Sequence, residues 1–428
     1  MKKIINAITL FLIIAIFSEV SYAAEYLNSV EFNEKYMNNN VMWSGKEWIT
    51  DTYPPKISQD GTDFTEVEGN EEIPNIMKFG QFGYKYVWTG SDYLVYKKNH
   101  GYLDANDIKY MYRLSEDFNT ILNTYQIPNL INNLEFIDDK IFIATENVLP
   151  MYRVNGDPSS GILKAYRFSF EIYYSTDCVE WTKVENDIIK SFYGDGINMQ
   201  KINDKLFINH MLYSDDKLID IKYEAHEPCR VSKVGSYICE VVPDNEYKTE
   251  NNTVLAFSND GVYWAYLPID IKTNVIQKVF ELGDEIVIED YRDYYVGDKE
   301  EVFSQLREKL PNNPVYVKFN DDILGFDEPP IIEDGSTLVP MRFLFEQMGA
   351  DVEWNSETQT ATATLDNKAV TFSIDNVNAR INNKPAKMDV PARLVNGKTM
   401  VPLRFLSENM GYDVDWDADS RTAIIKDI

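Results

Sequence analysis

The chain has 428 residues and carries 69 acidic against 41 basic side chains, which gives a formal net charge of −28. So acidic a chain excludes most nucleic-acid-binding roles, because phosphate backbones are bound through clustered lysine and arginine. Hydrophobic residues make up 44% of the chain and aromatic residues 13%. This composition excludes an intrinsically disordered protein and, with many tyrosines and phenylalanines, favours strands over helices.

The N-terminus has the pattern of a signal peptide. Lys2 and Lys3 precede an apolar run from Ile8 to Phe17, and small residues follow at Ser21 and Ala23. The run is too short to cross a hydrocarbon core of about 30 Å. We therefore expect cleavage after Ala23 and a secreted protein that is extracellular or associated with the cell wall. About 400 residues remain, more than one hydrophobic core usually organises, so we expect at least two domains.

Three segments of the first half share the turn pattern Ser-x-Asp-Gly-x-x-aromatic. In such a turn the aspartate bonds nearby backbone amides, the glycine accepts a positive φ, and the aromatic ring packs beneath the hairpin. The residues that we assign to these structural turns are Asp60, Gly61 and Phe64, then Asp177 and Trp181, and finally Asp260, Gly261 and Trp264. Cys178 takes the place of glycine in the second copy, so we expect that turn to be distorted or to use a different geometry. Ser115-Glu-Asp117-Phe118 is a degenerate fourth copy.

A second type of hairpin recurs between these turns. Its copies begin at Val41, Val87, Phe136, Ile202 and Phe280, and the turns of the first two are 45 residues apart. Two hairpins in about 40 to 50 residues make one four-stranded sheet, which is the size of a propeller blade. We predict five such units, and leftover strands at the two ends can complete a sixth.

The Ser-x-Asp-Gly-x-x-aromatic turns resemble the Asp-box of sialidase-like β-propellers, and the resemblance covers roughly residues 30 to 295. It implies a β-propeller whose Asp-box turns are folding devices at the blade edges. Such turns lie far from the central site of a propeller, so the resemblance implies nothing about catalysis.

Three cysteines are too few for a disulfide scaffold. Cys229 and Cys239 flank Lys233-Val234-Gly235 symmetrically, and a three-residue hairpin there would place them opposite each other. We predict a disulfide between these two residues. The alternative is a pair of buried free thiols.

An amphipathic helix is expected after the propeller-like part. Asp298 begins it, Phe303, Leu306 and Leu310 share one face, and Pro311 ends it. We expect this helix to close the propeller or to lie between domains, and the Pro-Asn-Asn-Pro segment that follows to be a linker.

The C-terminal part is a duplication, because residues 317 to 364 align with residues 379 to 426 at a constant offset of 62. The aligned positions to which we assign a structural role are Pro340, Arg342, Glu346, Gly349 and Trp354 in the first copy, and Pro402, Arg404, Glu408, Gly411 and Trp416 in the second. Each proline begins a short helix, each glycine ends it, and each tryptophan is expected in the core. Each arginine and glutamate stand four residues apart, which predicts a structural ion pair; a paired ligand clamp is the alternative.

The repeated pattern Leu/Met-Val-Pro-x-Arg-Phe-x-x-Glu-x-x-Gly-x-x-Val-x-Trp resembles the copper amine oxidase N-terminal-like domain, over residues 315 to 428. The resemblance implies a non-catalytic accessory domain, often found in tandem on exported proteins of Gram-positive bacteria. It does not imply amine oxidase activity, which needs a His-x-His pair, a third histidine and an Asn-Tyr-Asp/Glu motif. The only histidines are His100, His210 and His226, and no two of them lie at ligand spacing.

The predicted fold is therefore mainly β, a propeller-like domain of five to six blades followed by a duplicated small α+β module. The predicted divisions are a signal peptide at 1–23, the propeller-like domain at 24–297, a helix and linker at 298–314, and the duplicated module at 315–428 with repeats 315–376 and 377–428.

The sequence offers no catalytic, cofactor-binding or metal-binding motif that we can assign. Calcium in the acidic turn Asp417-Ala-Asp419 is the one metal that we consider, and an ordinary solvated turn has the same sequence. We expect a non-catalytic binding or structural protein, whose propeller recognises carbohydrate or protein and whose C-terminal module attaches or spaces it. The oligomeric state stays open.

The alternative is a secreted glycosidase with a sialidase-like propeller, which would need an arginine cluster and paired carboxylates about 5 to 9 Å apart. Its early Arg-Ile-Pro-like motif is missing from this sequence. The arginines that could form the cluster are Arg113, Arg153, Arg167, Arg230 and Arg292.

Overall fold

The fold is known from a computed structural model of the chain. It describes residues 33–34, 41–59, 63–70, 72–73, 84–97, 110–137, 139–150, 166–184, 197–203, 205–214, 217–224, 228, 231–242, 253–269, 271, 276–290 and 294–428. The expected signal peptide and the residues Asp60 and Gly61 lie outside these ranges. No helix in the described ranges is long and apolar enough to cross a membrane.

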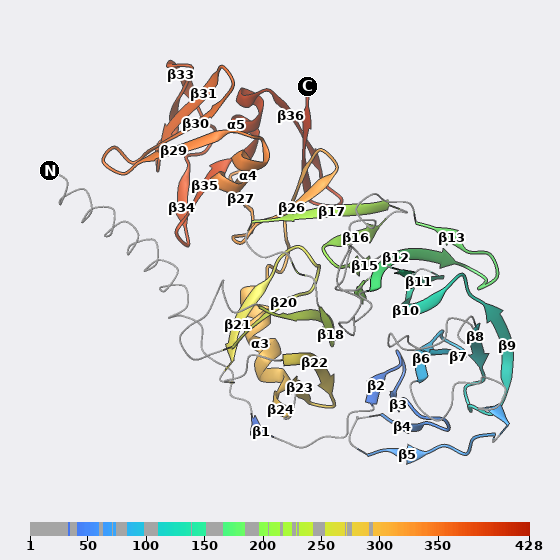
Figure 1. Ribbon diagram of the computed structural model, residues 1–428. Helices are drawn as coiled ribbons and strands as arrows, with labels where there is room; N and C mark the ends of the chain where they lie inside the picture. The colour runs from blue at the N-terminus through green and yellow to red at the C-terminus, as the bar shows by residue number, and fades with distance from the viewer. Residues whose placement is uncertain are drawn as a thin grey trace, which may run out of the picture.

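Six four-stranded antiparallel units form the first part of the molecule, arranged as propeller blades (Figure 1). The first three blades consist of β2 (Val41–Trp43), β3 (Trp48–Thr50), β4 (Lys56–Ser58) and β5 (Thr65–Glu66); β6 (Tyr84–Trp88), β7 (Tyr93–Lys97), β8 (Tyr110–Leu114) and β9 (Ile121–Gln126); and β10 (Leu130–Ile137), β11 (Lys140–Pro150), β12 (Tyr166–Ser175) and β13 (Thr182–Lys183). The next three consist of β14 (Met199–Ile202), β15 (Lys205–Ile208), β16 (Met211–Ser214) and β17 (Lys217–Tyr223); β18 (Ser232–Val234), β19 (Tyr237–Val241), β20 (Thr253–Ser258) and β21 (Ala265–Ile269); and β22 (Ile276–Leu282), β23 (Glu285–Asp290) and β24 (Tyr294–Asp298) with β1 (Asn33–Glu34).

The ring of blades is closed in two ways. The N-terminal strand β1 supplies the outer strand of the sixth blade by pairing with β24, with Asn33 opposite Val296. A hydrophobic cluster then joins the sixth blade to the first, where Trp48 packs with Leu282 and Val287. Similar clusters fill the interfaces between the other successive blades. The prediction of a sixth unit completed by a leftover strand is therefore confirmed.

The Asp-box turns join the third and fourth strands of their blades, as their common pattern requires. In the fifth blade the Oδ1 atom of Asp260 accepts hydrogen bonds from the amides of Val262 and Tyr263, at 2.8 and 2.9 Å, and Gly261 has a φ of 78°. In the third blade Asp177 bonds two amides in the same way, and Cys178 has a φ of 62°. The expectation of a distorted turn at Cys178 is therefore wrong, because cysteine adopts the left-handed conformation that glycine has elsewhere.

The degenerate fourth copy also forms this turn. The amide of Asn119 donates to Asp117 at 3.1 Å, and Phe118 has a φ of 60° at the glycine position. Of the residues Asp60, Gly61 and Phe64 assigned to the first copy, only Phe64 is described, and it packs against the cluster between the sixth and first blades.

The hairpin before Cys239 differs from the prediction. Ser232 stands opposite Cys239, and Val234 pairs with Tyr237 across a two-residue turn. The expected three-residue turn that would place Cys229 opposite Cys239 is therefore wrong. The thiol of Cys239 is free and buried, and Cys229 lies outside the described residues, so the hairpin gives no support to the predicted disulfide.

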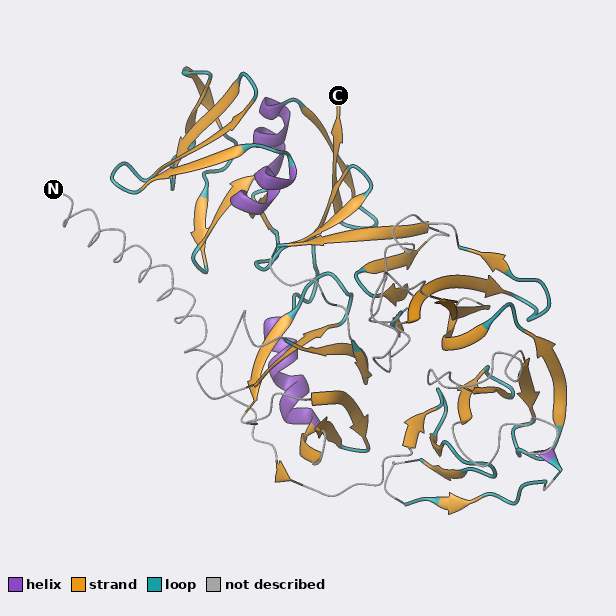
Figure 2. Cartoon of the chain, in the orientation of Figure 1, coloured by secondary structure: helices purple, strands orange, loops and turns teal. Residues whose placement is uncertain are grey.

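The predicted helix is present as α3 (Lys299–Lys309), with Asp298 as its N-cap and the amide of Glu301 bonded to the Asp298 carboxylate at 2.8 Å. Its buried face, Val302 and Leu306, packs on the cluster between the fifth and sixth blades. The helix therefore covers two blades of the propeller (Figure 2).

The C-terminal domain, residues 315–428, repeats each element at the offset of 62 residues. The first copy contains β25 (Tyr316–Phe319), β26 (Asp322–Gly325), β27 (Ile331–Glu333), β28 (Ser336–Pro340), α4 (Met341–Gln347), β29 (Asp351–Asn355) and β30 (Thr360–Leu365). The second contains β32 (Asn378–Ile381), β33 (Lys384–Lys387), β34 (Arg393–Val395), β35 (Lys398–Pro402), α5 (Leu403–Met410), β36 (Tyr412–Asp417) and β37 (Thr422–Asp427), preceded by β31 (Lys368–Ser373). The duplication read from the sequence is thus a duplication of structure.

The two copies exchange strands rather than folding separately. Strands β28 and β35 pair antiparallel with Val339 opposite Val401, which are equivalent residues of the two copies. The sheet of β29 to β33 mixes both copies, and so does the pairing of β25 with β37. A shared core under α4 and α5 unites them (Figure 2).

The prolines and glycines of the repeat have the expected roles, and one of the two expected ion pairs is present. Gly349 and Gly411 end their helices with φ angles of 74° and 99°, and Pro340 and Pro402 are the N-caps. Arg404 and Glu408 form the expected ion pair at 3.2 Å. The corresponding Arg342 and Glu346, both within the described residues, form no such pair.

The expectation that the tryptophans lie in the core is wrong. Trp354 is 45% exposed and Trp416 is 38% exposed. Their strand neighbours Ala361 and Ala423 are buried in the core of the domain, so these alanines and not the indoles fill it.

Strand β26 pairs in parallel with β17 of the fourth blade, and this pairing joins the C-terminal domain to the propeller (Figure 1). Ile221 stands opposite Ile323, and the two parts thereby share one eight-stranded sheet. Gly325 is required at this contact, because a Cβ atom there would lie 2.8 Å from the Tyr223 ring.

The segment after α3 is held to the fifth blade. The Tyr316 hydroxyl donates to the Oδ2 atom of Asp260 at 2.9 Å, and the Tyr263 hydroxyl donates to the Val315 carbonyl. The Asp-box carboxylate that shapes the blade turn therefore also fixes the entry to the C-terminal domain.

Candidate functional site

A groove of about 560 Å³ lies where the third blade, the fourth blade and the C-terminal domain meet. We call it the junction groove. Its lining residues are Tyr174, Thr182, Lys183, Val184, Tyr213, Lys217, Leu218, Ile219, Lys318 and Asp321. Because strands of three different units supply these residues, the groove depends on the docking of the C-terminal domain through β26 and β17.

The floor of the junction groove is aromatic and rigid. Tyr174 and Tyr213 both contact the fully buried Phe142, with ring centroids 5.7 and 4.8 Å away. Val184 and Leu218 pack beside them in the cluster between the third and fourth blades. Tyr213 is only 8% exposed, so Tyr174 is the tyrosine whose ring can meet a sugar ring. The Lys140 ammonium group lies 5.3 Å from the centre of the Tyr174 ring.

The rim of the groove is polar and mostly cationic. Lys183 extends from β13, Lys217 begins β17, and Lys318 lies on β25. Asp321, in the turn between β25 and β26, is the one acid among the lining residues. An aromatic floor with a small number of placed polar groups is the usual composition of a ligand-binding groove.

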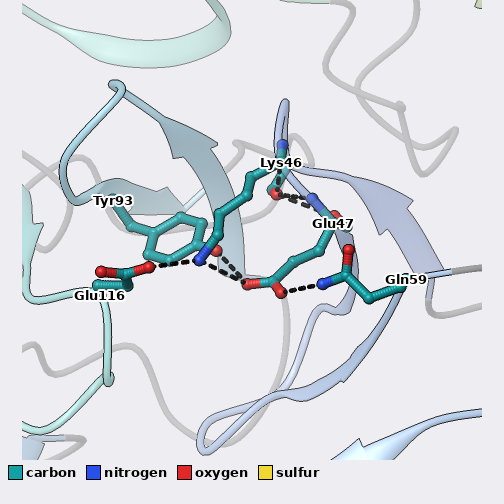
Figure 3. Close-up of polar contacts among 6 residues, drawn as sticks. Lys46, Glu47, Gln59, Tyr93 and Glu116 are labelled. Carbon is teal, nitrogen blue, oxygen red and sulfur yellow. Dashed lines mark hydrogen bonds and ion pairs between the residues drawn. The ribbon is translucent and has the colours of Figure 1, made fainter.

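A buried tyrosine and glutamate form the most enzyme-like pair in the described residues (Figure 3). The Tyr93 hydroxyl donates to the Oε1 atom of Glu47, and the Gln59 amide donates to Oε2 at 3.0 Å. Burial, reinforced by the Glu47 carboxylate, raises the pKa of the Tyr93 hydroxyl far above its usual value. Tyr93 is fully buried and Glu47 is 3% exposed, so no substrate can reach this pair without opening the blade interface.

Lys46 covers the same cluster from the solvent side. Its ammonium group lies 2.7 Å from the Glu116 carboxylate, 3.7 Å from that of Glu47, and 4.6 Å from the centre of the Trp88 ring. The contacts link the first and second blades (Figure 3). We therefore assign this cluster a structural role, since its buried carboxylate is bonded on all sides by the protein.

Glu135, on strand β10 of the third blade, is a carboxyl group whose pKa is raised into the range of a general acid. Burial raises its pKa to about 7, and Lys233 and Lys201 oppose this increase. The charged groups that act on Glu135 are therefore two lysines, which belong to the next two blades. Glycoside hydrolysis needs a second carboxyl group near the first, and neither lysine can take that role.

The residues considered for a glycosidase are not brought together in the described part of the chain. Arg113 forms an ion pair with Asp92 at 2.7 Å within the second blade. Arg153, Arg230 and Arg292 lie outside the described residues, and so does the side chain of Arg167.

The structure describes one of the three histidines. His210 lies 3.4 Å from the Asp220 carboxylate, and His100 and His226 lie outside the described residues. Within the described ranges, no three His, Cys, Asp or Glu residues are grouped as metal ligands would be.

The acidic turn considered for calcium bonds to itself. The Oδ1 atom of Asp417 accepts from the Asp419 amide at 3.0 Å, and Oδ2 accepts from the Ser420 hydroxyl at 2.7 Å. These bonds, the Ser420 hydroxyl first, lower the pKa of the Asp417 carboxyl. The arrangement is that of an ordinary Asx turn.

Comparison with known proteins identifies the C-terminal domain. Residues 318–425 match the Copper amine oxidase N-terminal domain family. The resemblance read from the repeat is therefore confirmed for this part of the chain. No curated protein matches the chain.

The chain is also similar to solved structures at low identity. Hsv2 of Kluyveromyces lactis is 10% identical with a TM-score of 0.33, over 84% of this chain and 98% of that protein. The Trypanosoma rangeli sialidase, solved in complex with 2,3-difluorosialic acid, is 11% identical with a TM-score of 0.30, over 87% of this chain and 88% of that protein. The mainly β, propeller-like fold itself follows from the six blade sheets described above.

No motif in the sequence indicates the junction groove. Its residues belong to three units that are up to 147 positions apart, from Tyr174 to Asp321. A sequence reading assigns Lys217 and Lys318 to ordinary solvated strand positions, and only the pairing of β17 with β26 brings them to one groove.

Proposed function

We propose that this chain is a secreted, non-catalytic recognition protein of the bacterial exterior, and that it binds an extracellular polysaccharide in the junction groove. The observation that carries the proposal is the groove itself, with two fixed tyrosines as its floor and polar side chains at its rim. The N-terminal pattern of Lys2, Lys3 and the apolar run to Phe17 supports export.

The C-terminal domain has a part in recognition under this proposal. It contributes Lys318 and Asp321 to the groove, and its β26 strand continues the sheet of the fourth blade. A domain that served only as a spacer would not need to supply side chains to the same groove.

Substitution of the groove tyrosine tests the proposal. Tyr174→Ala removes one stacking surface, worth about 1–1.5 kcal/mol, so we expect affinity for the bound polysaccharide to fall about tenfold. Isothermal titration with purified cell-wall polysaccharides, using the whole mature chain, measures this loss.

Tyr110→Ala is the matched control, because Tyr110 is 45% exposed on β8 of the second blade and does not line the groove. Binding should be unchanged in this variant. Equal affinity of Tyr174→Ala and the unaltered chain, or binding to a protein ligand that ignores the groove, would contradict the proposal.

Glycoside hydrolysis is the second candidate function, and Glu135 is the residue to test for it, because a carboxyl group with a pKa of about 7 can act as a general acid at neutral pH. The charged groups that act on Glu135 are lysines, so the second carboxyl group of the reaction would have to come from elsewhere in the chain. Incubation of the whole chain with chromogenic glycosides tests it. Turnover that is abolished in Glu135→Gln would establish the enzyme function in place of pure binding.

A further inference from the structure

We propose that the junction groove selects a polysaccharide that carries regularly spaced anionic groups, carboxylate or phosphate, over neutral chains. This inference rests on the proposed binding function and specifies the class of its ligand. It is carried by the lysines that three separate strands direct to one groove of an acidic protein.

The charge of the groove is opposite to that of the chain. The whole sequence carries a formal charge of −28, yet the groove is lined by Lys183, Lys217 and Lys318 against the single acid Asp321. A neutral sugar needs no such excess of ammonium groups, whereas a carboxylate or phosphate gains charge-assisted hydrogen bonds from them.

The three lysines differ in their partners within the fold. Lys183 is held by the Glu171 carboxylate at 2.6 Å. Lys217 and Lys318 form no ion pair with any other residue of the described part of the chain, but the Lys318 charge adds to the side-chain and backbone hydrogen bonds that lower the pKa of the Asp417 carboxyl. Lys217 can therefore bind an external anion without breaking an ion pair, and an anion at Lys318 competes with the charge of Asp417.

The positions of Lys217 and Lys318 indicate an extended ligand. In the shared sheet Lys318 stands opposite Ile323, and Ile323 stands opposite Ile221, four residues after Lys217 on β17. Alternation along β17 puts Lys217 on the same face as Ile221. With about 3.3 Å per residue and 4.8 Å per strand, the Cα atoms of the two lysines are roughly 16 Å apart. Two lysines on Cα atoms this far apart can bind two anionic groups of one extended chain.

The tyrosines and lysines then divide the work of recognition. Tyr174 stacks on a sugar ring regardless of charge, with the buried Tyr213 beneath it in the same cluster, while Lys217 and Lys318 bind the anionic substituents. Asp321 accepts hydrogen bonds from sugar hydroxyls and repels an anionic group placed beside it, which fixes the register of the chain.

Isothermal titration of the whole mature chain with three oligosaccharides of equal length tests the inference. One carries carboxylates (oligogalacturonate), one carries phosphates (a phosphorylated malto-oligosaccharide), and one is neutral (a malto-oligosaccharide). We expect at least one anionic oligomer to bind at least tenfold more tightly than the neutral one, and the affinity to fall as the salt concentration rises. Whichever anionic oligomer binds more tightly shows whether the groove prefers carboxylate or phosphate groups.

The variant Lys217→Gln with Lys318→Gln should lose at least tenfold in affinity for the anionic oligomer. The control is Lys384→Gln with Lys387→Gln, which makes the same change in net charge on the outer strand β33 and should bind as the unaltered chain does. Far-ultraviolet circular dichroism and thermal unfolding confirm that both double variants are folded.

The outcomes separate the inference from the proposed function. If the neutral oligomer binds as tightly as the anionic ones and only Tyr174→Ala weakens binding, charge selection is wrong and groove binding stands. If galacturonate monomer or inorganic phosphate binds as tightly as the oligomers, the extended ligand is wrong. If no oligosaccharide binds and Tyr174→Ala has no effect, both proposals fail.

Discussion

Asp260 and Asp177 occupy equivalent positions in two blade turns, but only Asp260 also bonds a residue of the C-terminal domain. Both carboxylates accept two turn amides and a serine hydroxyl. The amides of Glu180 and Val179, followed by the Ser175 hydroxyl, lower the pKa of the Asp177 carboxyl. Asp260 has one further partner, the hydroxyl of Tyr316, and therefore also anchors the C-terminal domain.

We predict that Asp260→Ala destabilises the protein by about 2–4 kcal/mol, because it removes four hydrogen bonds, one of them from the part-buried Tyr316 hydroxyl. Asp177→Ala, at the equivalent turn, should cost less. Urea denaturation of the two variants measures the difference. An equal cost would show that the Tyr316 contact contributes nothing.

Glu135 predicts a pH dependence of stability with a defined sign. Its pKa is raised from 4.5 to about 7 in the folded protein, so the folded state binds more protons than the unfolded state between these values. Stability from this group is therefore present below about pH 4.5 and is lost as the pH rises through 7. Glu135→Gln should make the protein more stable than the unaltered chain at pH 8, by about 1–3 kcal/mol.

Thermal unfolding at pH 4.5 and pH 8 checks this prediction. The exposed Glu353→Gln is the control and should change stability by less than about 0.5 kcal/mol at both pH values. A Glu135→Gln variant that tracks the unaltered chain at both pH values would show that the carboxyl group is solvated.

Two equivalent strands of the duplication differ in their neighbours: one pairs with the propeller and the other is an edge strand. Strand β26, with the sequence Asp-Ile-Leu-Gly, is mostly buried and pairs with the propeller. Its equivalent β33, with the sequence Lys-Pro-Ala-Lys, is mostly exposed at the outer edge of its sheet. Lysine and proline at an edge discourage further strand pairing, so the two copies have diverged into one joining edge and one protected edge.

The elements were predicted well where local chemistry decides them. The Asp-box turns, the helix α3 with its Asp298 cap, and the repeat with Gly349 and Gly411 as helix stops all depend on residues close together in the sequence. The predictions that were wrong concern how deeply a strand residue is buried. Trp354 and Trp416 are exposed although they were expected in the core, because alternation predicts which face of the sheet a side chain lies on but not whether that part of the face is covered.

The whole molecule behaves as one structural unit in its contacts. The shared eight-stranded sheet is reinforced by an ion pair of Lys398 with Glu224 at 2.7 Å. Asp327 lies beside them, and its burial, together with the Glu224 charge, raises its pKa to about 6. The predicted linker therefore leads into a tightly docked domain.

We predict a single cooperative thermal transition for the mature chain, since the two parts share a sheet and the buried cluster around Ile323. Ile323→Asp, which places a charge at a buried position of β26 in the cluster between the propeller and the C-terminal domain, should separate the transition into two. Differential scanning calorimetry makes this measurement. Two separate transitions in the unaltered chain would mean that the junction contributes little to stability.

The sequence by itself determined the blade turns, the recurrence of four-stranded sheets, the capped helix and the duplication, because each is set by interactions within about 10 to 50 residues. Only the tertiary structure decided the closing role of β1, the exchange of strands between the two copies and the junction groove. All three features depend on which strand edges pair. Every strand edge presents the same backbone N–H and C=O groups, so the sequence of a strand does not identify its partner. The pairing of β17 with β26 is therefore a property of the folded surface, and the groove that follows from it has no local signature.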